Sequence, residues 1–290
     1  MAKHRLNVQG LARRDPALMS CLLADEGMTV VSADLTSGEP SVLGHFSKDP
    51  MYLYATVQGK GKAPAYNPNG VLLLDDIYLM TASVSPLGKD LMWDAFNTTY
   101  NGLRFDEQWL TDPEVIKDAL SEIRKLHKML CLALGYSMGP KKMVKQAYEQ
   151  GYTITMTTAR EFFNTYWNLF NKIKRLGDVL GSRFKHQGYL VNPFGFRLTP
   201  DKDYKALNYF IQSSVSSIMH ILLAKFFTAC PYAIFITVIH DEVLFEVPTS
   251  KLREAKAAMD IAVTSLNTDL KWDVPIRVGW APGKNWYEAK

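Results

Sequence analysis

The sequence predicts an α+β fold, with an antiparallel sheet built from the two ends of the chain and helices in the middle. Residues 28–33, MTVVSA, form an apolar run that is typical of a buried strand. Near the other end, the runs YAIFITVI and VLFEV flank His240-Asp241-Glu242, which predicts a hairpin with an acidic tip. The segments between these strands carry apolar residues at helical spacing.

The first half of the chain is expected to be mainly helical after its first strand. A helix is predicted within 35–47, and the Gly-, Pro- and Asn-rich stretch 58–70 is typical of an exposed loop. Asp112-Pro113-Glu114 predicts a helix start, because Asp caps helices, Pro suits the first turn and Glu is favoured at the positive end of the dipole. This helix is expected to run to about Leu134, before Gly135.

The second half is expected to return from helices to the sheet. Residues 158–186 are predicted to be helical with a basic outer face, and 192–195, NPFG, to form a turn between short strands. One long helix over 203–229 then leads into the acidic hairpin, and 273–286 begins as a strand and ends in a loop.

The composition is that of a soluble globular protein. The chain has 290 residues, enough to bury a sizeable core, and is 47% hydrophobic and 21% charged. A net charge of +4 permits a polyanionic partner without requiring one. The three cysteines are widely spaced and odd in number, so neither a disulfide framework nor a zinc site is indicated.

No segment of the sequence indicates a membrane. The first ten residues, MAKHRLNVQG, contain no apolar core of a signal peptide. The longest apolar stretches, such as IMHILLAKFF, are too short and too interrupted to span a bilayer. The sequence therefore predicts a soluble, cytoplasmic protein.

Two carboxylates at strand ends are the strongest candidates for metal binding. Asp34 follows the first strand, and Asp241 lies at the tip of the distant hairpin. A single acidic turn is weak evidence, because Asp also forms turns through local hydrogen bonds. Two carboxylates brought together from distant parts of the chain would instead suit a two-metal site, since hard divalent cations take oxygen ligands.

A stripe on the predicted helix that begins at 113 carries cations followed by an aromatic residue. Its members recur every four residues and therefore share one side of the helix: Arg124, Lys128, Leu132 and Tyr136. Two cations and a flat ring would suit a nucleoside triphosphate. The alternative is a solvated basic stripe that also carries Lys125 and His127.

Three further polar residues allow two interpretations each. Glu39, five residues after Asp34, is either a metal ligand or substrate-shaping group, or the first-turn acid of a helix. Asn208 and Gln212, one turn apart in an apolar helix, either read base or sugar edges or hydrogen-bond each other.

In this order, the segments resemble the family A DNA polymerases, which include the bacterial repair polymerase and many phage enzymes. The family's first motif corresponds to VSADLTSGEPSVLGHFSKDP, its second to RKLHKMLCLALGYSMG and its third to VIHDEVLFEV. GYLVNPFGFRLTP and NYFIQSS resemble the hairpin and the amide-bearing helix that lie between the second and third motifs. The resemblance implies a right-hand polymerase palm, an antiparallel sheet backed by helices, with a helical fingers insertion.

The resemblance assigns the two aspartates to catalysis. Asp34 and Asp241, with the backbone carbonyl of Leu35, are expected to hold two Mg²⁺ ions, and Glu242 is expected to stand behind these ligands rather than bind metal. Arg124 and Lys128 are expected to neutralise the triphosphate of an incoming dNTP, with Lys128 as proton donor to the leaving group.

The remaining implied roles concern selection of the nucleotide and contact with DNA. Tyr136 is expected to stack near the new base pair, and Glu39 to occupy the space of a ribose 2′-hydroxyl. Leu132 stands where the family has an aromatic residue against the nucleotide, so nucleotide stacking there is weakened. Contacts with primer or template are expected from the residues His240, Asn208, Gln212 and Arg197.

The implied organisation is a palm at 1–48 and 187–290 with fingers at 49–186. The family's thumb and exonuclease domains are expected to be absent, so a split or truncated enzyme of phage type is predicted, acting in the host cytoplasm. The expected partners are primer–template DNA, dNTPs and a second polypeptide that carries a thumb. Without that polypeptide, weak DNA binding and low processivity are expected.

Three rival functions remain open on the sequence. A single-subunit RNA polymerase relative would share the palm carboxylates, although Glu39 argues against it. A catalytically weak DNA-binding or assembly subunit would keep the fold, although the retained aspartates and cations argue against it. A metal-dependent nuclease would not need the cationic helix.

Overall fold

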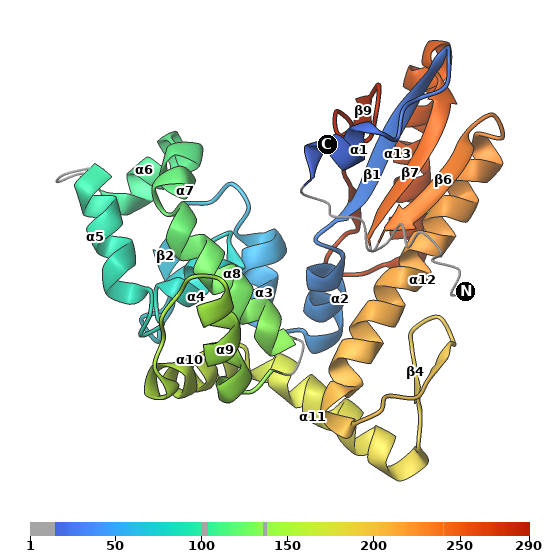
Figure 1. Cartoon of the computed structure of the whole chain (residues 1–290). Coiled ribbons are helices and arrows are strands. Elements are labelled where there is room, and N and C mark those ends of the chain that lie inside the picture. Colours follow the sequence, from blue (N-terminus) through green and yellow to red (C-terminus); the bar gives the residue numbers. More distant parts are fainter. Residues whose placement is uncertain (1–14, 100–103, 136–137, 240) are drawn as a thin grey trace, which may run out of the picture. The chain divides into compact units, whose positions relative to one another are not determined.

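The computed structural model describes residues 15–99, 104–135, 138–239 and 241–290, and these residues form two compact units (Figure 1). The first unit comprises the described residues within Met1–Ser41 and Ser213–Lys290, and the second those within Val42–Gln212. The first is built on a sheet and the second is mainly helical, and each is described by itself.

The sheet of the first unit has five antiparallel strands, drawn from both ends of the chain. They are β1 (Met28–Thr36), β6 (Ile234–Ile239), β7 (Glu242–Pro248), β8 (Arg277–Val278) and β9 (Ala281–Gly283). The order is β6-β7-β1, and β1 pairs with both β8 and β9 along its other edge. The predicted first strand and acidic hairpin are therefore confirmed, and so is the α+β fold.

Both faces of this sheet are covered, although they differ in polarity: Val31 and Ala33 of β1 point to an apolar face, whereas Ser32 and Asp34 point to the other. On one face, Phe245 of β7 packs against Phe226 of α12 (Ala206–Ala229), with ring centroids 4.8 Å apart. On the other face, Leu244 joins a buried cluster with Met19 and Trp286. Adjacent strand residues point to opposite faces, so Leu244 and Phe245 divide between the two layers.

The remaining helices of the first unit precede β1 or lie between strands in the chain. They are α1 (Pro16–Ser20), the start of α2 (Gly38–Ser47), and α13 (Leu252–Leu270), which follows a 3₁₀ turn at Thr249–Lys251 and packs on β7. Helix α2 agrees with the helix predicted within 35–47, although β1 continues through Thr36 before it.

The second unit consists mainly of short helices. Its helices are α3 (Pro50–Leu53), a π-helical turn (Tyr54–Gln58), α4 (Ile77–Ala82), α5 (Lys89–Thr99), α6 (Phe105–Thr111), α7 (Pro113–Ala119), α8 (Ser121–Gly135), α9 (Pro140–Glu149), α10 (Met156–Leu169), α11 (Asn171–Gln187) and a 3₁₀ turn (Asp203–Lys205). Two short hairpins complete it, β2 (Ala65–Tyr66) with β3 (Leu72–Leu73) and β4 (Leu190–Val191) with β5 (Arg197–Leu198). The β4–β5 pair confirms the predicted turn at 192–195.

Two helices that the sequence predicts as continuous are broken. The helix expected from 113 to about 134 is interrupted at Leu120, and the one expected over 158–186 is interrupted at Phe170. Both residues leave the helical conformation, with ψ angles of 8° and 54°, and both are fully buried. Apolar residues recur at helical spacing across each break, so periodicity alone missed the turns. Asp112 also makes no capping hydrogen bond through its side chain, contrary to expectation.

Within the part of the chain that the structure describes, one stretch, Asp203–Ala229, which contains α12, is long and apolar enough to cross a membrane by length and composition. This contradicts the expectation that every apolar stretch is too short. However, 56% of its most apolar window is buried inside the protein, as in the core helix of a globular protein. Length and composition are therefore weak evidence for a membrane span here.

His127 belongs to the core of the second unit and not to a solvated stripe. Its side chain is fully buried, and Nδ1 lies 2.8 Å from the carbonyl oxygen of Ile123. Because a carbonyl only accepts, Nδ1 carries the proton, and Nε2 accepts from the hydroxyl of Ser85 at 2.6 Å. The alternative interpretation of 124–136 as a wholly solvated stripe is therefore wrong at this position.

Acid is expected to destabilise the protein through His127. Burial lowers the pKa of His127 to about 4, whereas an unfolded histidine titrates near 6.5. The unfolded chain therefore binds more protons between these values, and stability present above pH 6.5 is lost as pH falls toward 4, on the order of 3 kcal/mol. The free energy of unfolding is to be measured from pH 4.5 to 7.5, where it should rise with pH in the wild type. In His127→Gln this slope should disappear. The slope should remain in His186→Gln, which removes an exposed histidine of α11.

Candidate functional site

Asp34 and Asp241 are held by adjacent strands. Asp34 is exposed and stands third from the end of β1, while Asp241 is half-buried and directly precedes β7. Asp34 pairs with Glu242 across the two strands, and the backbone N–H of Leu35 donates to the carbonyl oxygen of Asp241 at 2.9 Å. The strand pairing thus places residues that are about 200 positions apart in sequence beside each other.

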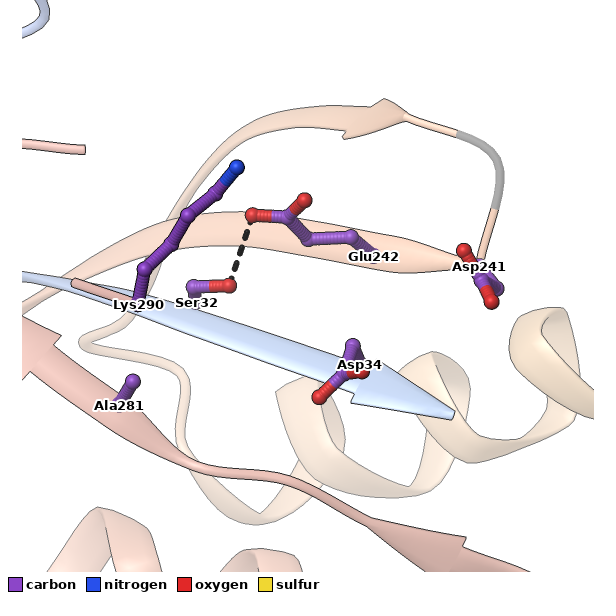
Figure 2. Close-up of a pocket in the computed structure, with 6 residues that line it drawn as sticks. All are labelled: Ser32, Asp34, Asp241, Glu242, Ala281 and Lys290. Carbon is purple, nitrogen blue, oxygen red and sulfur yellow. Dashed lines mark hydrogen bonds between the residues drawn. The ribbon is translucent and has the colours of Figure 1, made fainter. Parts of the chain in front are cut away.

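Both aspartates line one pocket of about 280 Å³ (Figure 2). Its lining residues all come from the sheet and the end of the chain: Ser32, Asp34, Asp241, Glu242, Ala281 and Lys290. Residues at i and i+2 of a strand share a face, as do residues directly opposite on a neighbouring strand, so Ser32, Asp34 and Glu242 face the same side. The pocket is therefore an acidic site built on a rigid sheet.

Glu242 differs from the two aspartates because its carboxylate is buried and hydrogen-bonded within the protein. Its Oε1 accepts from the hydroxyl of Ser32 at 2.7 Å, as Figure 2 shows, and from Nε1 of Trp286 at 2.9 Å. Buried carboxylates need such donors to offset the loss of water. Trp286 is itself fully buried. The arrangement fixes Glu242 beside Asp241.

Gly279 lies against Asp34 on the other edge of β1. Its N–H donates to the carbonyl oxygen of Asp34 at 2.8 Å. A Cβ atom at this position would overlap the carboxylate of Asp34. A residue with a side chain at this position would therefore displace the carboxylate of Asp34.

The donor set in the pocket suits Mg²⁺. Mg²⁺ is usually held by one or two carboxylates together with water and substrate phosphates, rather than by a cage of protein ligands. Asp34 and Asp241 are two such carboxylates on one pocket, next to the backbone of Leu35. Among the residues that the structure describes, no group of three or more His, Cys, Asp or Glu side chains could form a fuller cage.

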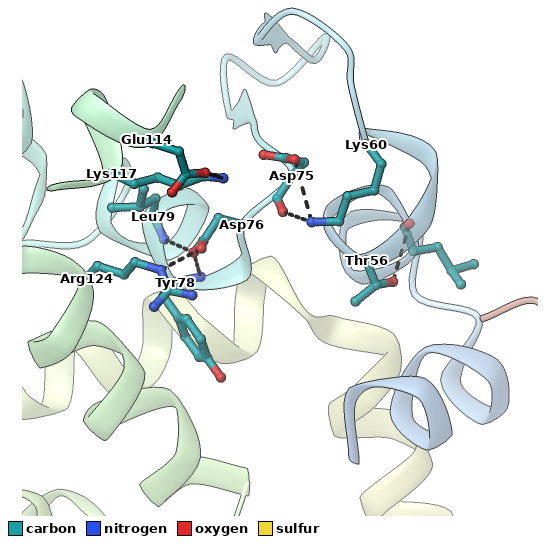
Figure 3. A network of polar contacts seen from close by, with 10 residues as sticks. Thr56, Lys60, Asp75, Asp76, Tyr78, Leu79, Glu114, Lys117 and Arg124 are labelled. Atoms are coloured by element: carbon teal, nitrogen blue, oxygen red, sulfur yellow. Dashed lines mark hydrogen bonds and ion pairs between the residues drawn. The ribbon is translucent and has the colours of Figure 1, made fainter. Parts of the chain in front are cut away.

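The cationic residues of α8 belong to the second unit. Lys128 is exposed and Leu132 is half-buried. Arg124 is partly exposed, and its Nε donates to Oδ2 of Asp76 at 2.6 Å (Figure 3). Tyr136, the last member of the predicted stripe, lies outside the described residues. Arg124, Lys128 and Leu132 keep the spacing of one side of α8.

The remaining predicted residues occupy several elements. Glu39 lies half-buried in the first turn of α2. Arg197 is exposed on β5, with its guanidinium carbon 4.1 Å from the ring centroid of Tyr189. Asn208 is half-buried and Gln212 exposed, one turn apart on α12. His240 lies outside the described residues.

Four residues that contact these side chains were missed in the sequence. The position of Ser32 could have been predicted from the sequence, because strand periodicity places it on the same face as Asp34. Trp286 and Gly279 stand far from the motifs in sequence, and Asp76 precedes Arg124 by 48 residues. No local pattern predicts these contacts, because they depend on strand pairing and helix packing.

Comparisons with known proteins place the chain in a family. The sequence model of DNA polymerase family A matches residues 107–288. The chain is 26% identical over 245 residues to the DNA polymerase of Mycobacterium phage D29, covering 84% of this chain and 33% of that protein. It is 23% identical over 303 residues to the thermostable DNA polymerase I of Thermus filiformis, covering 98% and 30% respectively.

A solved structure has the same fold. The POL domain of Pol1 from M. smegmatis, in complex with DNA primer–template and dNTP, matches with a TM-score of 0.72 at 18% identity. The match covers 98% of this chain and 45% of that one, and the chain spans about a third of the length of the two polymerases above. The family model alone covers more than half of the chain. The chain belongs to DNA polymerase family A.

Proposed function

We propose that this chain carries the catalytic centre of a template-directed DNA polymerase, which adds deoxynucleotides from dNTPs to a primer 3′-hydroxyl. The single observation that carries the proposal is the pairing of Asp34 and Asp241 on one pocket, in a chain of this family. Two Mg²⁺ ions bound there would activate the 3′-hydroxyl and stabilise the leaving pyrophosphate. The aspartates, with the carbonyl of Leu35, would hold them.

In the proposed reaction, side chains from both units act on the nucleotide. Arg124 and Lys128 are cations one turn apart on α8, so both suit triphosphate oxygens. Lys128, which is exposed, would also give a proton to the leaving group. Tyr136, Glu39 and Leu132 would shape the space around the base and sugar. We propose accordingly that 1–48 and 187–290 form the palm and that 49–186 form the fingers.

The DNA-binding part of the proposal is supported by exposed cations on α11. Lys172, Arg175 and Arg183 lie within one side of this helix by their spacing and are all exposed. Lys174 and Lys185 of the same helix are instead paired with Asp178 and Asp203. Exposed cations on one helix face suit phosphate groups. His240, Arg197, Asn208 and Gln212 would add contacts to primer or template.

Primer extension tests this proposal. With Mg²⁺, a primed template and low salt, the chain is expected to add the templated deoxynucleotide, and Asp241→Ala is expected to lose this activity. Low salt is needed because phosphate-driven binding weakens steeply as salt rises. Asp260→Asn is the matched control, since Asp260 is an exposed carboxylate of α13 that pairs with Lys256.

The same assay separates the rival functions. Extension with NTPs in preference to dNTPs would identify an RNA polymerase. Shortening of the primer would identify a nuclease. DNA binding without any extension, unchanged by Asp241→Ala, would identify a binding subunit. The length of the products tests the expectation that a second polypeptide is needed for long extension. The proposed place of action is the cytoplasm of a host cell, which this assay does not address.

A further inference from the structure

The guanidinium of Arg124 is held by a carboxylate from outside the segment that matches the family model. Asp76 directly precedes α4, and its Oδ2 accepts from Nε of Arg124 at 2.6 Å (Figure 3). The family model matches 107–288, so Arg124 lies inside the matched segment and Asp76 outside it. The contact therefore joins a residue of the family's second motif to a part of the chain that the family model does not cover.

Asp76 is itself fixed in place by α4. Its Oδ1 accepts from the backbone N–H groups of Tyr78 and Leu79 at 2.9 and 3.0 Å, so it caps the helix. Helix α4 packs against α8, and four of its six residues, from Leu79 to Ala82, are buried. The side chain of Asp76 is only 9% exposed. The carboxylate thus has one orientation, dictated by the cap and the core.

Arg124 is oriented by two contacts that leave its outer nitrogens available. One is the Nε bond to Asp76, and the other is the ring of Tyr78, whose centroid lies 5.1 Å from the guanidinium carbon. The Nε–H is one of five donors on a guanidinium, and 36% of the Arg124 side chain is exposed. A planar group held at Nε and along its face keeps a fixed direction for its four other N–H bonds.

We propose that Asp76 is a positioning residue, which holds the guanidinium of Arg124 in the orientation that binds the triphosphate of a dNTP. This inference rests on the proposed function. Holding the side chain in advance removes the entropy that a free arginine would lose when it binds phosphate. Asp76 acts through Arg124 and touches no nucleotide itself.

Asp76→Asn is the most informative variant, because asparagine and aspartate are equally good helix N-caps and only the contact with Arg124 should change. Its Oδ1 would keep the two backbone bonds, and its Nδ2 amide, which only donates, would then replace the carboxylate oxygen that accepts from Arg124. Asp15→Asn is the matched control: Asp15 caps α1 through bonds to the N–H groups of Ala17 and Leu18, and α1 lies in the other unit.

The measurement is the Kd of Mg²⁺–dNTP, by titration calorimetry on the whole chain bound to a primer–template whose primer ends in a dideoxynucleotide. Asp76→Asn is expected to raise this Kd roughly tenfold, the equivalent of one hydrogen bond to a charged group. The maximal rate of single-nucleotide addition should change far less. In an Arg124→Lys background, Asp76→Asn should have no additional effect on Kd, because Asp76 acts through the guanidinium.

The outcomes separate this inference from the proposed function. If the wild type binds and adds dNTP while Asp76→Asn leaves Kd unchanged or lowers it, Asp76 does not position Arg124 for the nucleotide. Additive effects of the two substitutions would also overturn the inference. A wild type that binds dNTP without adding it would contradict the proposed function alone, and one that binds no dNTP would contradict both.

Discussion

Asparagine in place of either Asp34 or Asp241 is expected to lower the rate of nucleotide addition about a thousandfold or more, an increase of roughly 4 kcal/mol in the barrier. Asparagine keeps the size of the side chain and removes its charge, so each variant should fold and bind DNA. The rate is to be measured in single-turnover primer extension, with Asp269→Asn, an exposed carboxylate of α13 that pairs with Lys225, as the control.

The double variant Asp34→Asn/Asp241→Asn gives the sharper result. Both aspartates line the same pocket, so they are expected to act as one metal-binding unit. Once one carboxylate is lost, the other can add little to the rate of nucleotide addition. The double variant should therefore be about as slow as the slower single variant. A loss equal to the product of the two single losses would show that the carboxylates act independently, which is incompatible with shared ions.

Trp286→Ala is expected to lower the free energy of unfolding by about 3–5 kcal/mol, the range for deleting a large buried aromatic side chain. Trp286 is fully buried with Met19, Ile239 and Leu244, and its indole donates to the buried carboxylate of Glu242. Both packing and a hydrogen bond are therefore lost. Urea denaturation followed by circular dichroism measures the change.

Trp286→Phe separates the two losses. Phenylalanine keeps most of the apolar volume but removes the N–H donor, so a decrease of about 1.5–3 kcal/mol is expected from the loss of one hydrogen bond to the charged Glu242 carboxylate. The neighbouring Tyr287 is half-exposed, and Tyr287→Ala is expected to change stability by at most about 0.5 kcal/mol. Equal losses in Trp286→Phe and Tyr287→Ala would mean that the indole bond to Glu242 contributes nothing to stability.

Local sequence patterns predicted the elements on which the candidate site is built. The apolar run at 28–33 and the runs on either side of Asp241 became β1, β6 and β7, because short apolar runs bounded by turn residues favour strands. The same reasoning failed at Leu120 and Phe170, where a helix turns without any change in apolar period. It also placed His127 on a possible solvated stripe, although this residue is buried against Ser85.

By itself, the sequence determined the α+β class, the strand positions of Asp34 and Asp241, the spacing of Arg124 and Lys128 on a helix, and the resemblance to the polymerase family. These follow from residue type and short-range periodicity, which are local properties of the chain. Only the tertiary structure decided that Trp286 and Ser32 hold Glu242 and that Asp76 holds Arg124. Such contacts arise when strands pair and helices pack, and their geometry depends on the whole fold rather than on neighbouring residues.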